Sequence, residues 1–263
     1  HEETLANLET TWSLVEFAMQ WYKDTDVPLL RLEDEAHEQL ESDAMAVQSI
    51  VGSRYKHFAA GAVEWQKALT AISDVTTLLG EIQRTWSYLE PLFIGSEEVK
   101  RELPEDARRF LDIDTQVKSI LQKAYKAKNV KVVCMQPGLM QKLQGLETAQ
   151  DKCKKSLSEF LDGKRRQFPR FYFMSEADLL DLLSNSSQPQ KVLVHVDKIL
   201  LATKELTLQG SKGSDRPSAS DWVAGVGKEK VLFDTPIPLM GKAEAYLLSL
   251  LQAQIYTLSR LLS

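Results

Sequence analysis

Glycine–lysine pairs are the residues of this chain whose types come closest to nucleotide chemistry. A phosphate-binding loop has the pattern GxxxxGK followed by Ser or Thr, because its backbone amides surround the phosphates and its hydroxyl group reaches Mg²⁺. The pair at 227–228 is followed by Glu229, and the pair at 241–242 is followed by Ala243. Neither pair fits the pattern, so we interpret both as turns and expect no nucleotide cofactor in this chain.

The histidines and cysteines form no recognisable catalytic or metal-binding pattern either. A structural zinc site needs four suitably spaced ligands, and a zinc protease carries HExxH on one helix. The four histidines are far apart in the sequence, at His1, His37, His57 and His195. Two cysteines, Cys134 and Cys153, are too few for a disulfide framework and are interpreted as reduced thiols. We therefore expect no catalytic residue and no metal ligand.

A third stretch, KRRQFPRFYFMSEADLLDLLS at 164–184, combines cations with aromatic rings. Such a mixture could stack the bases of a nucleic acid. The net charge of −5 argues against phosphate-backbone binding as the main task of the chain. The longest apolar runs are a few residues, far below the roughly 20 that span a bilayer. We therefore expect neither a nucleic acid nor a membrane as partner.

The same stretch fits a corner between two helices. Pro169 would end one long helix, and Ser175 with Asp178 three residues later resembles a capping box at the start of the next. The rings between them are expected to form an extended segment that anchors the corner by burying a large apolar area. The candidate corner or docking residues are Phe171, Tyr172, Phe173, Arg165, Arg166 and Trp222.

Helical spacing of apolar residues dominates the elements that must position these side chains. The clearest seam runs from Phe58 to Phe93 at intervals of three and four, which predicts one long helix that Pro91 ends or bends. Further helices are expected over 2–16, 33–51, from 104, 136–168, from 175, 188–205 and 242–262. A hairpin is expected at 17–30, and a strand at 231–239 whose prolines confine it to a sheet edge. The predicted fold is mainly α, an elongated array of antiparallel helical bundles with one or two small β-hairpins.

We expect three parts along the chain. Residues 1–128 form a proximal helical subdomain with the hairpin and the long helix, and 129–206 form a central helical subdomain. Residues 207–263 hold a mobile loop, a hairpin and the final helix. Pro137 and Gly138 interrupt helical continuity and are the candidate hinge. The chain starts within a helical pattern and without an initiator methionine, so we expect a piece of a longer protein.

Five stretches, in order along the whole chain, resemble the linker of dynein heavy chains. WSLVEFAMQWYKDTDVPLL (12–30) is similar to its entry helix and hairpin, IQRTWSYLEPLF (82–93) to its Q-x-x-W-x-Y-L-E signature, and ELPEDARRF (102–110) to the segment that follows. FPRFYFMSEADLLDLLS (168–184) and WVAGVGKEKVLFDTPIPL (222–239) resemble its most recognisable run and its closing hairpin. DTDVPLL, SRYKHF and IQRTWSYLEPLFIGSEEVKRELP together resemble axonemal outer-arm chains of the beta type. One departure is the turn VGKEK at 226–230, where the family usually has Glu-Gly-Glu.

The resemblance implies a mechanical role. In the family, a helical arm lies across a ring of six AAA+ modules and swings between bent and straight states to produce the power stroke. This chain itself would not be an enzyme, whereas the parent heavy chain would be a microtubule-stimulated ATPase with ATP and Mg²⁺ in its ring. The implied partners are that ring and, through other parts of the parent, microtubules and the intermediate and light chains. The implied location is the cytoskeleton of the ciliary axoneme.

Two other functions are weighed against this one. A spectrin-like or tethering helical scaffold would explain the long seam alone, but such arrays repeat at a fixed period. The tryptophans fall irregularly, at 12, 21, 65, 86 and 222, and we find no such repeat. An enzyme whose site is assembled only in space is the second alternative, and a hydrolysis assay would detect it.

Overall fold

The computed structural model describes residues 2–52, 59–210 and 216–263. The chain divides into two compact units, whose described residues fall within 1–95 and 105–154 for the first and within 96–104 and 155–263 for the second. Each unit is described separately below. The predicted division into three parts stays a prediction.

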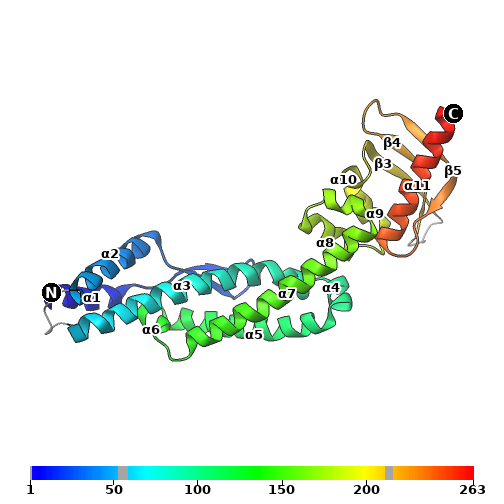
Figure 1. The fold of residues 1–263 in the computed structure, drawn as a ribbon. Helices are drawn as coiled ribbons and strands as arrows, with labels where there is room; N and C mark the ends of the chain where they lie inside the picture. Colours follow the sequence, from blue (N-terminus) through cyan, green and yellow to red (C-terminus); the bar gives the residue numbers. More distant parts are fainter. Residues whose placement is uncertain (1, 53–58, 211–215) are drawn as a thin grey trace. The chain divides into compact units, whose positions relative to one another are not determined.

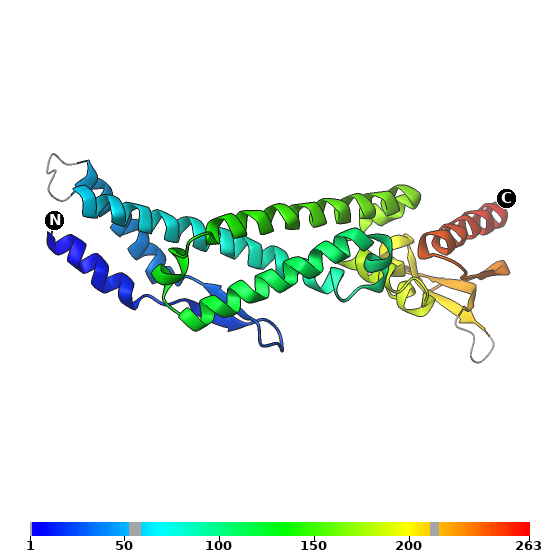
Figure 2. The ribbon, with the colours of Figure 1, turned by 90° about the horizontal axis from the view of Figure 1, so that it is seen from below.

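The first unit is a bundle of helices with one hairpin. It contains α1 (Glu2–Leu14), β1 (Ala18–Trp21), β2 (Pro28–Arg31), α2 (Asp34–Val51), α3 (Ala59–Phe93), α5 (Pro104–Ala127), α6 (Val130–Cys134) and the first part of α7 (Leu139–Gln167). Helices α3 and α5 run side by side (Figures 1 and 2), and the Phe93 and Phe110 rings stack between them at 5.5 Å. Strands β1 and β2 pair antiparallel. The predicted hairpin is therefore confirmed.

The long apolar seam forms the core of this unit. The seam residues from Ala62 to Phe93 are all buried, and α3 continues through Pro91 to Phe93 rather than ending there. Phe58, the first residue of the predicted seam, lies outside the described residues. The 3.5-residue periodicity thus predicted both the length of α3 and the face that it buries.

The second unit combines short helices with a three-stranded sheet. It contains α4 (Glu97–Glu102), the rest of α7, η1 (Pro169–Phe173), α8 (Glu176–Ser184), α9 (Pro189–Val192), η2 (Leu193–His195), α10 (Val196–Ile199), β3 (Thr203–Gln209), β4 (Ser218–Ala224), β5 (Lys230–Pro238) and α11 (Ala243–Leu262). The antiparallel sheet has the order β3-β4-β5, and α11 packs beside β5 (Figure 1). The predicted edge position of the proline-containing strand is confirmed. Helices dominate both units, and both sheets are small and antiparallel. The predicted mainly-α fold class is therefore confirmed.

Two local predictions in this unit are wrong. The helix predicted over 188–205 is instead three short helical turns, and the chain then adopts a left-handed conformation at Ala202 (φ 61°) and enters β3. Pairing with β4 overrides the helical spacing there. The aromatic segment expected to be extended is the 3₁₀ helix η1, because Pro169 begins a tight turn with Phe171 N–H bonded to the Phe168 carbonyl at 3.0 Å. Of the loop predicted to be mobile, 209–221, residues 211–215 lie outside the described residues, and 218–221 belong to β4.

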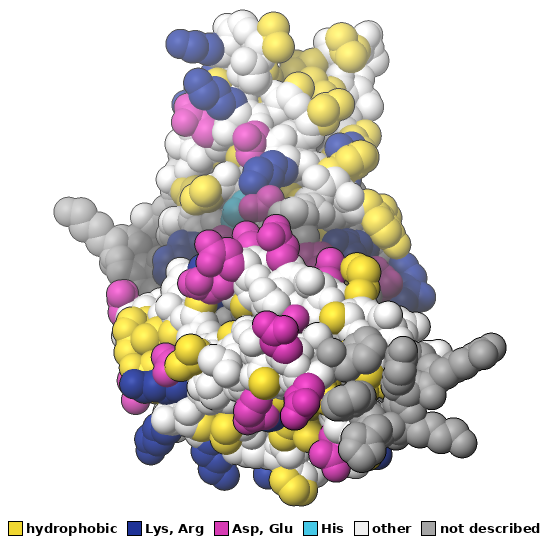
Figure 3. All heavy atoms as spheres, turned by 90° about the vertical axis from the view of Figure 1, so that its left-hand side faces the viewer, with side chains coloured by type: hydrophobic (Ala, Val, Ile, Leu, Met, Phe, Trp, Pro, Cys, Tyr) yellow, Lys and Arg dark blue, Asp and Glu magenta, His cyan; other side chains and the backbone are white. Residues whose placement is uncertain are grey.

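Acidic side chains gather on the end of the first unit that carries α1 and α2 (Figure 3). The exposed carboxylates of α2 are Asp34, Glu35, Glu38 and Glu41. A face of this charge repels a phosphate backbone. No helix among the described residues is long and apolar enough to cross a membrane.

Candidate functional site

The three consecutive rings of η1 do not share one environment. Phe171 is fully buried and packs edge-on against Phe168 at 4.9 Å. Tyr172 and Phe173 are 60% and 75% exposed. A 3₁₀ helix turns each residue by about 120°, so one ring in three can face the core. Phe171 therefore packs into the core, whereas the Tyr172 and Phe173 rings face solvent.

The side chains of the three cations that precede η1, Lys164, Arg165 and Arg166, point in different directions. Arg165 donates to the Asp162 carboxylate at 3.3 Å, and Arg166 donates to the Asp162 carbonyl at 3.3 Å from an exposed position. Lys164 points into the second unit, where its side chain is only 7% exposed. The basic cluster of the sequence is therefore no continuous cationic surface.

Trp222 lies inside the sheet of the second unit. Its side chain on β4 is buried and packs against Phe233 of β5 with ring centroids 4.7 Å apart. A docking contact needs an accessible side chain, and this ring is covered by its own unit. Of the two roles open to it, anchor of the strand pair fits this geometry.

A charged node lies where the final helix begins. The Lys164 ammonium of α7 contacts the Glu244 carboxylate of α11 at 2.6 Å, and the Glu244 side chain is 10% exposed. Beside this pair, Lys242 reaches Glu102 of α4 at 3.1 Å. We call these four residues the α11 node. They line a hollow of about 390 Å³ together with α7 side chains such as Phe160.

The electrostatics of the α11 node tie three helices together. The hydrogen bond from Lys242 holds the pKa of Glu102 below its ordinary value, and the charge of Lys164 acts in the same direction. A buried ion pair is stable only when both charges stay in place, because an unpaired buried charge is strongly unfavourable. One Glu244 oxygen, Oε2, is buried without a hydrogen-bond partner among the described residues, so that carboxylate depends on Lys164 for its ion pair. The node can therefore resist separation of α11 from α7.

A second polar cluster joins α8 to the turns before β3. The His195 Nε2 atom lies 2.8 Å from the Asp181 carboxylate, and Lys198 donates to Asp178 at 3.0 Å. Ser175 caps α8 by accepting the Asp178 N–H, which confirms the predicted cap. Donation from Lys198, and then from Ser175, lowers the pKa of Asp178. Each member has a local partner, so the cluster fastens two short helices.

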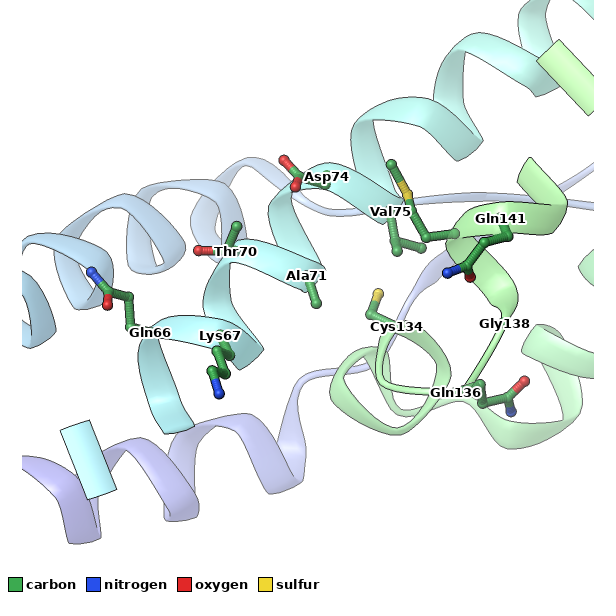
Figure 4. Close-up of a pocket in the computed structure, with 11 residues that line it drawn as sticks. Gln66, Lys67, Thr70, Ala71, Asp74, Val75, Cys134, Gln136, Gly138 and Gln141 are labelled. Atoms are coloured by element: carbon green, nitrogen blue, oxygen red, sulfur yellow. The ribbon is translucent and has the colours of Figure 1, made fainter. Parts of the chain in front are cut away.

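The candidate hinge lies beside a hollow of about 460 Å³ in the first unit (Figure 4). Gly138 has φ +80°, and an added Cβ would meet nothing within 4 Å. Its lining includes Ala71 of α3 and Cys134 of α6, together with polar side chains such as Gln66 and Gln141. Burial raises the pKa of the Cys134 thiol to about 12, and that of Cys153 to about 11, so neither is a thiolate nucleophile at neutral pH.

Sequence reasoning missed three of the four node residues. Lys164 stood out in a basic run, whereas Glu102, Lys242 and Glu244 are charged residues among many. A carboxylate in the first turn of a helix ordinarily reflects the helix dipole. Only the fold brings α4, α7 and α11 together. No group of three or more His, Cys, Asp or Glu side chains in the described ranges could hold a metal ion.

Comparison with known proteins places the whole chain in one family. Residues 1–263 match the model of the dynein heavy chain, N-terminal region 2. The chain is 41% identical over 249 residues to the dynein alpha chain of the flagellar outer arm of Chlamydomonas reinhardtii. It is 37% identical over 247 residues to human dynein axonemal heavy chain 9, and 37% over 248 residues to the ciliary dynein beta chain of Tripneustes gratilla.

Each of these matches covers 94% of this chain and 6% of the relative. The chain thus spans about 6% of the length of the curated relatives that it matches. The full-length family match agrees with the five ordered motifs found in the sequence. The chain belongs to the dynein heavy chain family, and it corresponds to sequence within N-terminal region 2 of these heavy chains.

Proposed function

We propose that this chain is the mechanical linker of an axonemal outer-arm dynein heavy chain, a lever arm that bends and straightens to produce a power stroke. The full-length match to N-terminal region 2 of dynein heavy chains carries the proposal. The parent would be a microtubule-stimulated AAA+ ATPase that holds ATP and Mg²⁺ in its ring, and this segment would bind no nucleotide itself. Its partners would be that ring and, through the rest of the parent, microtubules and the intermediate and light chains.

The relatives' names support the location in the axoneme. They read flagellar outer arm, axonemal and ciliary. Flagellar outer-arm alpha and beta chains both match, at 41% and 32% identity, so we place the proposal at the level of the outer arm. The beta-type subclass stays a prediction.

The helices suit a part that carries load. Helix α3 has 35 residues, α5 has 24 and α7 has 29, and close-packed helices resist compression. In the second unit, force applied to α11 would reach α7 through the Lys164–Glu244 pair and α4 through Lys242–Glu102. The α11 node would thus hold the final helix to the arm during a stroke.

The exposed rings of η1 are the best candidates for docking. Tyr172 and Phe173 present large apolar area to solvent beside a buried Phe171, and exposed aromatic side chains are favoured at protein interfaces. We propose that they contact the ring of the parent. Replacing both by Ser should leave the stability of the arm nearly unchanged and reduce microtubule gliding velocity, whereas unchanged gliding would contradict the docking role.

Fluorescence energy transfer in the parent heavy chain tests the swing. One fluorophore replaces exposed Glu38 on α2 and the other exposed Gln252 on α11, and the transfer efficiency is compared with and without nucleotide. A lever arm predicts a change of efficiency between nucleotide states. A control pair within the second unit, Lys191 with Gln252, should stay constant. A constant efficiency for the first pair as well would refute the lever-arm proposal.

The same method locates the bend. Pro137 and Gly138 lie within the first unit, whereas the unit boundaries fall at 95/96, 104/105 and 154/155. We propose Pro137 and Gly138 as the hinge and test them with a pair at exposed Lys126 and Lys142. A nucleotide-dependent change for this pair supports the hinge at 137–138. No change for it, together with a change for the pair between units, moves the bend to the unit boundary.

A further inference from the structure

One face of α3 carries three polar or amphipathic side chains toward the hairpin. Gln83, Trp86 and Glu90 are spaced i, i+3 and i+7, so they lie on one side of the helix. They belong to the stretch IQRTWSYLEPLF that marks the family resemblance. The lever-arm role does not explain why these three residue types occur there, but the contacts of their side chains do.

The Gln83 side chain bonds to a single residue of β2. Its Oε1 atom accepts the Leu30 N–H at 2.7 Å, and its Nε2 atom donates to the Leu30 carbonyl at 2.9 Å and to the Leu79 carbonyl at 3.1 Å. Gln83 and Leu30 are both buried. In an antiparallel pair every second residue turns its N–H and C=O groups away from the partner strand. The Gln83 amide therefore takes the place that a third strand would have at Leu30.

A two-stranded hairpin by itself is marginally stable in water. This one is also short, with four residues in each strand. Most side chains of β1 are at least partly exposed, including Trp21. Apolar burial alone is thus a modest source of stability for β1–β2. The hydrogen bonds between Leu30 and Gln83 therefore contribute a larger share of the stability of the hairpin.

Trp86 and Glu90 hold the turn end of the hairpin. The Tyr22 ring, next to β1, packs on Trp86 with centroids 4.6 Å apart, and the Tyr22 hydroxyl donates to Glu90 at 2.9 Å. The Trp86 indole N–H donates to Asp114 of α5 at 2.9 Å. The face of α3 thus binds the hairpin at two points and α5 at a third.

We propose that Gln83, Trp86 and Glu90 form a hairpin clamp, which positions β1–β2 on α3 and α5 and prevents the hairpin from opening separately. The Gln83 amide makes the hydrogen bonds that a neighbouring strand would make at Leu30, and Glu90 accepts the hydrogen bond from the Tyr22 hydroxyl. The clamp explains why a buried amide, a buried indole and a half-buried carboxylate occur at this spacing on α3. It does not depend on the proposed motor function.

Hydrogen exchange of the 263-residue chain, followed by mass spectrometry, tests the clamp. In Gln83→Leu the Leu30 N–H and C=O groups lose their buried partner, so the amides of 18–31 should exchange about tenfold faster or more. Amides of α5 and α7 should keep their rates. In Tyr22→Phe, loss of one hydrogen bond should accelerate the same amides by about two- to tenfold.

Gln150→Leu is the matched control. Gln150 on α7 is also a buried glutamine that donates to a carbonyl of α3, that of Ile82, at 3.1 Å, but it does not touch the hairpin. It should leave the exchange of 18–31 unchanged relative to other amides of the unit. Unchanged hairpin exchange in Gln83→Leu, or equal acceleration in Gln150→Leu, would overturn the clamp. If Gln83→Leu does not fold, Tyr22→Phe decides: selective acceleration of 18–31 supports the clamp and uniform acceleration refutes it.

Discussion

The Lys164–Glu244 pair allows the sharpest stability prediction. Lys164→Met keeps most of the length of the side chain and removes the charge, which leaves the buried Glu244 carboxylate without its ion-pair partner. Removing one partner of a buried pair costs about 3–5 kcal/mol. We therefore expect Lys164→Met to lower the free energy of unfolding of the second unit by about 3–5 kcal/mol.

The double variant Lys164→Met with Glu244→Met separates the charge from the packing. Replacing both members of a buried pair by apolar residues is often neutral or stabilising, so this variant should recover most of the loss. Lys155→Met is the control on the same helix, because Lys155 and Glu159 form an exposed pair at 3.9 Å whose removal should cost at most about 0.5 kcal/mol.

The assay is hydrogen exchange across a urea series, which reports on the peptides of the second unit separately from those of the first. The reasoning would be refuted by a Lys164→Met cost no larger than that of Lys155→Met. A double variant as unstable as Lys164→Met alone would refute it too, since the loss would then come from packing.

Three further predictions follow from burial and charge. Phe171→Ala should destabilise the second unit by about 3–5 kcal/mol, whereas Phe173→Ala should change its stability by at most about 0.5 kcal/mol in the same urea assay. Cys134, whose pKa burial raises to about 12, should react with Ellman's reagent at pH 8 only after unfolding, so rapid labelling of the folded chain would contradict its burial. Because the pKa of Glu102 is lowered in the folded state, its stabilising contribution is present above the unfolded pKa of about 4.3 and is lost as the pH falls through the folded value. Lys242→Met should therefore reduce the loss of stability in acid, as measured by unfolding at pH 3 and pH 6.

The sequence predicted the helical framework well, because the regular spacing of apolar residues extends over many turns of each long helix. The seam that ends at Phe93 is readable from residue types alone, since every third or fourth side chain must be apolar to bury one face of a helix. The helix cap at Ser175 is also predictable, because it depends only on the Ser175 hydroxyl group and the backbone N–H of Asp178 three residues later. The strand β3 could not be predicted in the same way. Its residues from Thr203 owe their conformation to pairing with β4, which comes later in the chain.

The candidate site was predictable only in part for a related reason. The aromatic and basic stretch drew notice to Lys164 and Phe171, but nothing local indicates that Lys164 turns inward while Arg166, two residues later, stays exposed. Its partner Glu244 is 80 residues away. Charge pairs between distant helices follow from tertiary packing, and a single sequence carries no record of them.

The two prolines of β5 have a consequence for how this chain behaves at high concentration. Strand β5 is at the edge of its sheet, where a free row of amide and carbonyl groups would recruit the same strand from another molecule. Pro236 and Pro238 lack the N–H groups that such cross-molecular pairing requires. We expect the last third of β5 to be a poor seed for aggregation, and replacement of both prolines by Thr to promote fibrous or amorphous deposits on storage.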